Sequence, residues 1–256
     1  LSMSGPMMVS MLIQALYNVV DSMFVAQISE TALTAVSLAF PMQNLMVAVA
    51  TGTGVGVNAL LSRNLGERNF AMADRTAGNA ITLGLLSYLV FVVLGLTCTR
   101  LFFAMQVEDP TTIALGYDYL FYVTVLSFGL FGQVLFSRLL QSTGRTFYSM
   151  VIQIVGAVLN IVLDPIMIFG LGPCPAMGVK GAALATVISQ VVGTVLGIYY
   201  NLRKNPDIRF SRAALRPSLP VVSRIYSVGV PSILLQTVGS ILTFGLNQIL
   251  VAFSET

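Results

Sequence analysis

Two acidic residues stand inside long apolar stretches of the sequence. Asp164, directly followed by Pro165, lies within the nearly uncharged run 150–172, and Asp21 lies within the first apolar run of the chain. An ionisable side chain in a membrane-spanning segment costs about 2.5–3.5 kcal/mol on insertion scales. The proline removes a backbone donor and bends the helix beside the carboxylate. We therefore expect these acids to have a chemical role.

Amide side chains accompany each acid at helical spacing. Asn160 lies four residues and Gln153 eleven residues before the second acid, on the same helical face. Gln14 and Asn18 precede the first acid by seven and three residues, so all three lie on one face of a helix. Carboxylate and amide oxygens on two polar stripes indicate a relay for protons or small cations inside a membrane, and hence transport.

A structural role is the alternative for each acid. Asp164 can be a permanently protonated group that braces the bend at Pro165. Asp21 lies only about six residues from the next loop, so it can also be an acid that reaches towards the lipid headgroups. If both act as a relay, we expect the two side chains to approach within about 10 Å and to face the protein interior.

The composition excludes several classes of function. Of the 256 residues, 56% are hydrophobic and 9% charged, whereas about 25% are charged in soluble domains. Histidine and tryptophan are absent, and Cys98 and Cys174 are isolated, without a CxxC spacing. A histidine-based catalytic site and an imidazole metal site are therefore ruled out, and we expect inert thiols. We predict no enzyme activity, no cofactor and no metal beyond a coupling Na⁺ at the two acids.

Seven apolar runs are long enough to span a bilayer, which takes about 20 residues. They cover approximately 3–27, 33–61, 76–104, 112–141, 146–172, 178–202 and 222–252. Strand alternation is not seen, and the runs are too long for barrel strands. The sequence predicts an all-α membrane protein, a polytopic helical bundle.

The basic residues gather in alternate loops. Three loops, 62–75, 138–145 and 203–224, lie on one side of the predicted membrane and hold eleven of the 13 Lys and Arg residues: Arg63, Arg68, Arg75, Arg138, Arg145, Arg203, Lys204, Arg209, Arg212, Arg216 and Arg224. The positive-inside rule places this side, and with it the N-terminus, in the cytoplasm. The longest basic run is interpreted as a linker between lobes; a nucleic-acid or partner patch is the alternative.

The chain contains an internal repeat. The heptapeptide VAQISET at 25–31 returns as VAFSET at 251–256, and the SGP at 4–6 corresponds to GVP at 229–231. Because six predicted helices separate the copies, the repeat is parallel, as in transporters with two equivalent halves. We therefore predict a six-helix lobe at 1–202, a basic cytoplasmic linker at 203–221 and the first helix of a second lobe at 222–256. We expect the rest of that lobe to be missing.

The chain resembles the multidrug and toxic compound extrusion (MATE) transporters, within the multidrug/oligosaccharidyl-lipid/polysaccharide flippase superfamily. The motifs occur in family order and are Gly5-Pro6, NVVD at 18–21, Pro41, Gly52, Gly54 and Gly56, SRNLG at 62–66, LQSTG at 140–144, NIVLDPIMIFG at 160–170 and GVKGAALAT at 178–186. The resemblance implies a six-helix MATE-type N-lobe plus the first helix of the second lobe.

The resemblance also implies a function. Similar transporters export cationic, often aromatic compounds across the cell membrane in exchange for H⁺ or Na⁺, as monomers that alternate access between two lobes. Carried over, Asp21 and Asp164 bind the coupling cation, Asn160 is a hydrogen-bond partner, and Thr186 adds a hydroxyl ligand. The expected partners are small organic cations, the lipid bilayer and the missing second lobe, with no nucleic acid.

Other polar residues form stripes on the predicted helices. The candidates for lining a cavity are Gln14, Asn18, Asn44, Thr51, Gln153, Gln190, Gln236 and Asn247. Hydrogen bonds between helices are the alternative explanation for such stripes. Asn247 takes the place of Asp21 in the second copy of the repeat, so we expect coupling ions to bind the first lobe only. Close helix packing is expected at Gly52, Gly54 and Gly56.

Two alternative functions remain. A lipid-linked oligosaccharide flippase of the same superfamily would show a strongly basic central cavity, and we expect no Lys or Arg in the middle of a helix here. A membrane-embedded enzyme would need a carboxylate cluster for a metal or a His/Asp pair, and neither is present. We expect that the chain alone does not transport, with the first six helices compact and the last loosely attached or extended.

Overall fold

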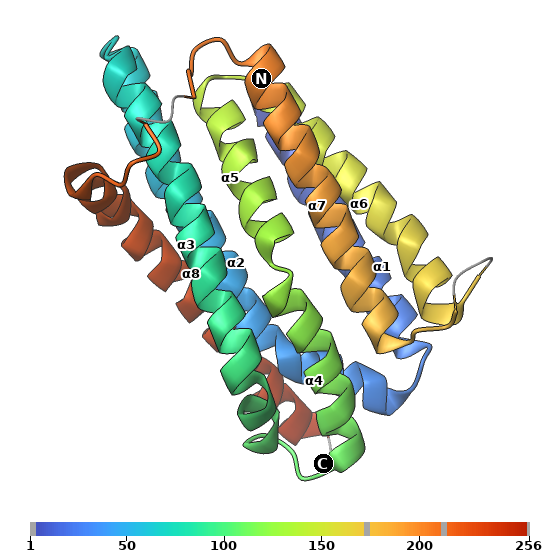
Figure 1. Cartoon of the computed structure of the whole chain (residues 1–256). Helices are drawn as coiled ribbons and strands as arrows, with labels where there is room; N and C mark the ends of the chain where they lie inside the picture. Colours follow the sequence, from blue (N-terminus) through green and yellow to red (C-terminus); the bar gives the residue numbers. More distant parts are fainter. Residues whose placement is uncertain (1–3, 172–174, 211–213, 255–256) are drawn as a thin grey trace.

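The computed structural model describes residues 4–171, 175–210 and 214–254, and it describes the side chains of all of these except 4, 7, 18, 240, 241 and 243–254. The described chain is helical and contains no strand (Figure 1). The helices are α1 (Ser4–Ala26), α2 (Glu30–Gly66), α3 (Phe70–Ala104), α4 (Pro110–Val125), α5 (Phe128–Ser142), α6 (Thr146–Phe169), α7 (Val179–Lys204) and α8 (Leu219–Ser254). The predicted fold class is confirmed. Cys98 is a free thiol, and Cys174 lies outside the described residues.

Six described helices are long and apolar enough to cross a membrane, and α4 with α5 makes a seventh span that is bent by 45°. The seven predicted spans are thus recovered, but the run 112–141 is two helices and not one. The Thr124 hydroxyl donates back to the carbonyl oxygens of Leu120 and Phe121, which bends a helix. After the break, Gly129 lets α5 lie directly on α7, since a Cβ there would be 2.8 Å from the Val191 nitrogen.

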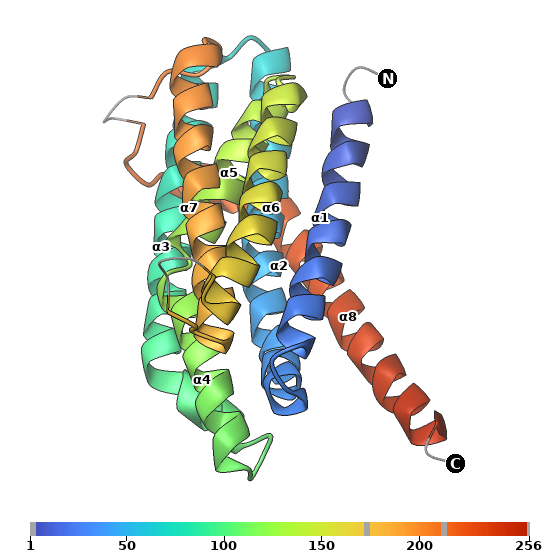
Figure 2. The same ribbon diagram turned by 90° about the vertical axis from the view of Figure 1, so that its right-hand side faces the viewer.

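The helices form a bundle in which α2 and α7 are the central elements. α2 packs on α3, α4, α5 and α8, and α7 packs on α4, α5 and α6. α1 stands at the edge of the bundle and contacts mainly α6 (Figure 2). Apolar side chains cover the outside of α3, as a lipid-facing surface requires, and they include Leu85, Leu86, Leu89, Val93 and Leu96.

The glycines of α2 allow α8 to lie unusually close. A Cβ on Gly56 would be 2.1 Å from the Ile225 carbonyl oxygen, and one on Gly52 would be 2.3 Å from the Ile233 side chain. The expectation of close packing at these glycines is confirmed. The expectation of a loosely attached last helix is wrong for its first half, which packs tightly on α2. Its second half extends away from the bundle (Figure 2).

The described parts of the linker between α7 and α8, residues 205–210 and 214–218, are held on the first turns of α3. The Asp74 carboxylate accepts from the Arg209 backbone N–H at 2.7 Å, and the Asn79 amide oxygen accepts from the Ser218 N–H at 2.8 Å. The Thr82 hydroxyl donates to a backbone oxygen of the same segment at 2.7 Å. Arg145 adds an ion pair with Asp207 at 2.9 Å. The linker therefore moves with the bundle instead of acting as a loose tether.

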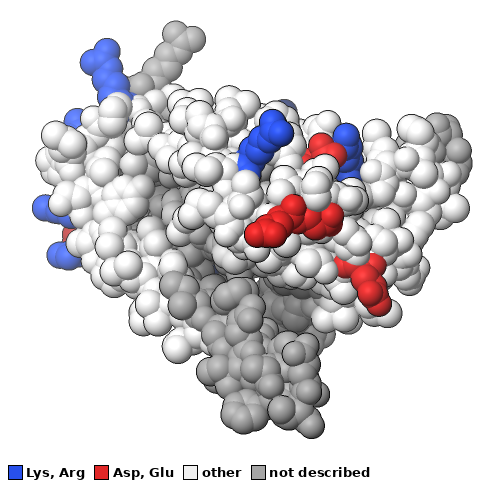
Figure 3. Space-filling view, turned by 90° about the horizontal axis from the view of Figure 1, so that it is seen from below, with Lys and Arg blue, Asp and Glu red and all other residues white. Residues whose placement is uncertain are grey.

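Charges separate between the two ends of the bundle. Most basic residues lie at the end of the bundle where α2, α5 and α7 end, while Glu30, Glu108, Asp109 and Asp118 lie at the other end together with Arg100 and Lys180. Acidic side chains gather on the face seen from below, with basic ones beside them (Figure 3). Asp109 caps α4 and accepts from the side chain and backbone of Thr112, which lowers its pKa. This separation agrees with the loop pattern from which the orientation was predicted.

Gly56→Ala tests the contact between α2 and α8. The added methyl group meets backbone and cannot be accommodated by a rotamer change, so we expect a loss of about 1–3 kcal/mol in stability, seen as a lower melting temperature in detergent. Gly66→Ala is the matched control, because nothing lies within 4 Å of its Cβ position. Equal melting temperatures for the two variants would contradict the packing.

Asn79→Ala tests the attachment of the linker. Loss of its hydrogen bonds to the linker, at a net of about 1–2 kcal/mol, is expected to speed tryptic cleavage after Arg209 by about five- to thirtyfold. The measurement is limited proteolysis followed by mass spectrometry. Asn58→Ala serves as control, since Asn58 bonds α5 and not the linker. An unchanged cleavage rate in Asn79→Ala would show that the linker is held by other contacts.

Candidate cation site

The two acids come from helices that cross each other. Asp21 lies in the last turns of α1 and Asp164 in the last turns of α6, and α1 packs chiefly on α6. Their carboxyl groups are close enough to interact directly. Asp164 is completely buried, and Asp21 is half-buried with one oxygen enclosed. The expected approach of the two acids is confirmed, and a headgroup-facing position for Asp21 is not observed.

Asn160 links Asp164 to α7. Its amide nitrogen lies 3.3 Å from an Asp164 carboxylate oxygen and 3.3 Å from the Thr186 hydroxyl. All three side chains are at most 2% exposed. The spacing of four residues along α6 places the amide one turn from the acid, as the sequence predicted. The structure therefore brings together the four residues to which the coupling role was assigned.

The site has more hydrogen-bond acceptors than donors. Within the described part of the chain, one oxygen each of Asp21, Asn160 and Asp164 is buried without a hydrogen-bond partner. Unsatisfied buried oxygens are costly, and a group of them is an unusual arrangement in a native interior. Three such oxygens beside the Thr186 hydroxyl form a set of hard ligands that suits a proton or a small monovalent cation.

Two tyrosines at the site were not foreseen. The Tyr17 hydroxyl lies beside that of Thr186. The buried Tyr119 hydroxyl donates to the Gln43 side chain at 3.4 Å and is near enough to both acids to interact with them electrostatically. Tyr17 precedes Asp21 by one helical turn, so its spacing could have identified it. Tyr119 comes from α4, and no sequence spacing connects it with the acids.

Several cavity candidates make contacts between or along helices. The Thr51 hydroxyl donates to Gln236 of α8 at 2.6 Å, and Gln153 donates to Ser149 at 3.5 Å. Gln190 packs against Gly129 of α5 and is half-buried. For Thr51 and Gln236, hydrogen bonding between helices accounts for the polar residues.

The remaining candidates do not reach the acid pair or are not described. Gln14 and Asn44 are exposed on α1 and α2. The side chains of Asn18 and Asn247 lie outside the described residues, as do those of the last turns of α8.

The assignment of Arg138 to the loop 138–145 is wrong. Arg138 belongs to α5, four residues before its end, and is half-buried. Its stem lies against Gly54, where a Cβ would be 2.7 Å away, and its guanidinium donates to Gln141 at 3.1 Å. The prediction failed because the residue was assigned to a loop that begins only after Ser142.

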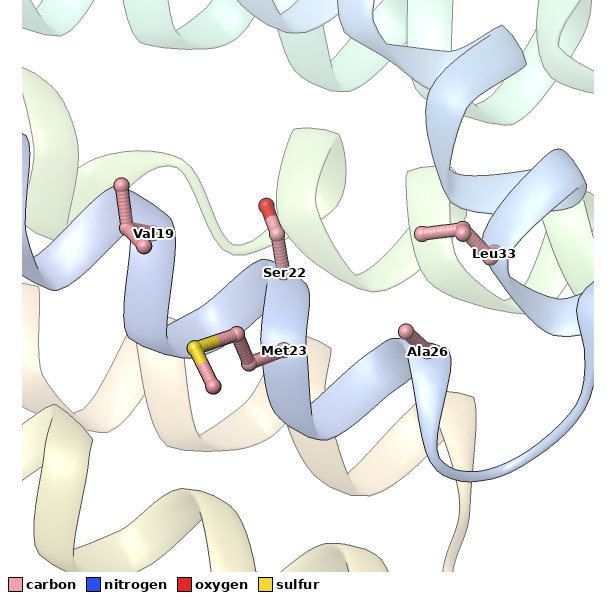
Figure 4. Close-up of a pocket in the computed structure, with 5 residues that line it drawn as sticks. All are labelled: Val19, Ser22, Met23, Ala26 and Leu33. Atoms are coloured by element: carbon pink, nitrogen blue, oxygen red, sulfur yellow. The ribbon is translucent and has the colours of Figure 1, made fainter.

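A surface groove lies near the acids but is separate from them. It has a volume of about 500 Å³ and is lined by Val19, Ser22, Met23 and Ala26 of α1 and Leu33 of α2 (Figure 4). Val19 and Met23 are 60% and 59% exposed, so this groove opens on the apolar outer side of α1. Its lining suits a lipid chain and offers no charged ligand.

Comparison with known proteins decides the family. The family model MatE matches residues 6–166, which is more than half of the chain. The chain belongs to the MatE family. Of solved structures, an outward-facing multidrug resistance MATE family transporter of the MOP superfamily is similar with a TM-score of 0.90 and 31% identity, over 97% of this chain and 54% of that one. The resemblance stated from the sequence is confirmed.

Two curated relatives carry different names. The FAD transporter of Shewanella oneidensis is 30% identical over 205 residues, which are 80% of this chain and 45% of the relative. The multidrug export protein MepA of Staphylococcus saprophyticus is 26% identical over 253 residues, 98% of this chain and 55% of the relative. The MatE chain thus spans about half the length of these relatives. It is a multi-pass membrane protein of a family of transporters and not of enzymes.

The surplus of acceptors predicts an uneven response to two substitutions of Asp164. In Asp164→Asn the new amide can donate to the free Asn160 oxygen, so we expect stability at least equal to that of the wild type. Asp164→Ala leaves the Asn160 amide without this partner and creates a cavity, so we expect a loss of about 1–3 kcal/mol in stability. Melting temperatures in sodium-free detergent buffer at neutral pH provide the comparison. An equal loss in both variants would mean that the unpartnered oxygens do not matter.

Proposed function

We propose that this MatE chain forms the ion-coupling half of an antiporter that exports small organic compounds in exchange for protons. The observation that carries the proposal is the acid pair at the contact of α1 and α6, with one buried, unpartnered oxygen on each acid and a third on Asn160. A permanently structural pair would be expected to have its oxygens satisfied. Sodium is the alternative coupling ion, with Asp21, Asp164, Asn160 and Thr186 as its ligands.

The pair can convert proton binding into movement. Two negative charges about 4 Å apart repel by about 4 kcal/mol at an effective dielectric constant of 20, and one proton removes this repulsion. Because α1 packs mainly on α6 and stands at the edge of the bundle, repulsion between the acids acts on the main contact of α1. Loss of the proton thus favours a displaced α1, and proton binding favours the packed one.

Organic cations are the proposed substrates. The name of the MepA relative indicates multidrug export, and the negative charge of the carboxylates attracts cations to this lobe. We further propose that the complete transporter works as a monomer in the cell membrane with a second lobe, and that the basic loops and the N-terminus face the cytoplasm. Protons then enter from the acidic end and leave at the basic end.

A flavin nucleotide is the second candidate substrate. The relative named as an FAD transporter is 30% identical, and Arg138 offers a half-buried guanidinium that has no acidic partner among the described residues. A guanidinium is a good ligand for phosphate groups. The two candidates differ in charge, so transport assays separate them.

The test is export from proteoliposomes that contain the full-length transporter to which this lobe belongs. With an imposed pH gradient, Asp164→Asn is expected to abolish export of the fluorescent cation ethidium while membrane insertion remains normal. Asp118→Asn is the control, since Asp118 pairs with Lys180 at 3.2 Å at the acidic end, away from the site. Undiminished export in Asp164→Asn would refute the coupling role.

The same preparation decides between substrates and ions. Export of FAD without export of ethidium would replace the organic-cation proposal by the flavin one. Export driven by a sodium gradient at equal pH on both sides would replace protons by sodium.

A further inference from the structure

The acid pair is much closer to one end of the bundle than to the other. Asp164 lies five residues before the end of α6 and 18 residues after its start at Thr146. These separations correspond to about 8 Å and about 27 Å along the helix axis. The basic loops are at the distant end. A proton on Asp164 is therefore near the acidic surface but separated from the basic surface by most of the membrane.

A polar face of α6 extends over this long distance. From the acid towards the basic end, the face carries Asn160, Gly156, Gln153 and Ser149, at spacings of four, four, three and four residues. Gln153 and Ser149 are hydrogen-bonded to each other at 3.5 Å. The face is thus polar or free of a side chain at every turn, in a helix that is otherwise apolar.

Two glycines make room for an amide between Asn160 and Gln153. The Gln133 nitrogen lies 3.2 Å from the position of a Cβ on Gly156, and the Gln133 side chain lies 2.7 Å from the Cβ position of Gly193 on α7. Any larger residue at Gly193 would displace this amide. Gln133 therefore projects from α5 into a notch formed by both neighbouring helices, next to the polar face of α6.

The polar face continues on α5 to the basic end. Ser137 and Gln141 follow Gln133 at intervals of one turn. The Gln141 amide donates to the Ser149 hydroxyl at 2.8 Å and accepts from Arg138 at 3.1 Å. Ser137 is 5% exposed, and its hydroxyl has no partner in the described part of the chain.

We propose that Gln133, Ser137, Gln141, Ser149 and Gln153 line a narrow hydrated path, the α5–α6 path, that carries protons between the acid pair and the basic end of the bundle. Unpartnered oxygens occur along and at the end of it, on Ser137, Asn160 and Asp164. Buried water commonly satisfies such groups, and a file of water relays protons. The direction of proton flow rests on the antiport function proposed above, whereas the presence of water does not.

The ionisable groups at the path lie at its two ends. Asp21 and Asp164 lie at its inner end together with the hydroxyls of Tyr17 and Tyr119, and Arg138 lies at its mouth. α6 and α7 contribute no further ionisable group between these ends. The guanidinium donates to Gln141 at 3.1 Å, and its fixed charge acts on every cation at the mouth. Between the two ends the path is lined by neutral polar groups, which suit water.

Cysteine reactivity measures whether water is present. In a Cys98→Ser, Cys174→Ser background, single cysteines replace Gln141, Ser149 and Gln153, and each reacts with the small neutral reagent methyl methanethiosulfonate. Because the reacting species is the thiolate, which needs water around it, these positions are expected to react at least about tenfold faster than the controls. The controls are Ile152→Cys, in the apolar core beside Gln153, and Val158→Cys, on the lipid-facing side. Equal rates would show that the polar seam is dry and would overturn the proposal.

Gly156→Ala tests whether the path is continuous. The methyl group would lie 3.2 Å from the Gln133 nitrogen and 3.7 Å from the Ser189 oxygen, so it fills the notch with only a small adjustment. We expect slower modification of Asn160→Cys, beyond the notch, and an unchanged rate for Ser149→Cys, before it. No change at position 160 would mean that water reaches the acids from the other end, which also overturns the proposal.

An impermeant charged methanethiosulfonate then assigns the open end. It is expected to modify Gln141→Cys from the same side of the vesicle as the loop marker Arg68→Cys, and modification from the opposite side only would contradict the path. These labelling assays do not depend on transport. If labelling shows a hydrated path but Asp164→Asn still exports fully, the coupling function alone is refuted. If labelling shows a dry seam and Asp164→Asn does not export, the path alone is refuted.

Discussion

The burial of two carboxylates side by side within membrane-spanning helices is the constraint on which the rest of the structure depends. Such groups are tolerated only where protein replaces water around them, and here α1, α6 and α7 do so incompletely. Asn160 satisfies one oxygen of Asp164, while three other oxygens of the site remain without donors. In the proposed antiporter this surplus of acceptors is where a positive charge binds and leaves, while the surrounding bundle holds the acids together.

Glycines determine how the surrounding helices can hold this arrangement. Gly181 lets the start of α7 approach the backbone of α6 at Met167, where a Cβ would be 2.4 Å from the carbonyl oxygen. This contact brings Thr186, further along α7, to within reach of Asn160. Gly52 and Gly56 likewise let the backbones of α2 and α8 approach closely. Without a hydrophobic driving force between helices in lipid, such close backbone contacts provide much of the packing energy.

The helices were predictable because membrane burial imposes long apolar runs, and Asp21, Asn160, Asp164 and Thr186 were identified by spacing and motif. The features that sequence reasoning missed depend on contacts between distant segments. The break between α4 and α5 contains neither proline nor glycine at its turn, and Tyr119 reaches the acids from a helix with no spacing relation to them. Arg138 was misplaced because a basic residue near a predicted loop is usually part of it.

The acid pair lies much closer to one end of the bundle than to the other, and this position affects how a two-lobed transporter can be coupled. Rocking of one lobe against the other exposes a site between the lobes to each side in turn, but the acids lie between α1 and α6, inside one lobe. A cation bound there does not have to share the route of the substrate. With polar side chains of α5 and α6 leading to the basic end and only about 8 Å of helix on the other side, the coupling ion and the exported compound can use separate openings. In the proposed antiporter the acid pair thus acts on the substrate through the position of α1 and not by direct competition for one site.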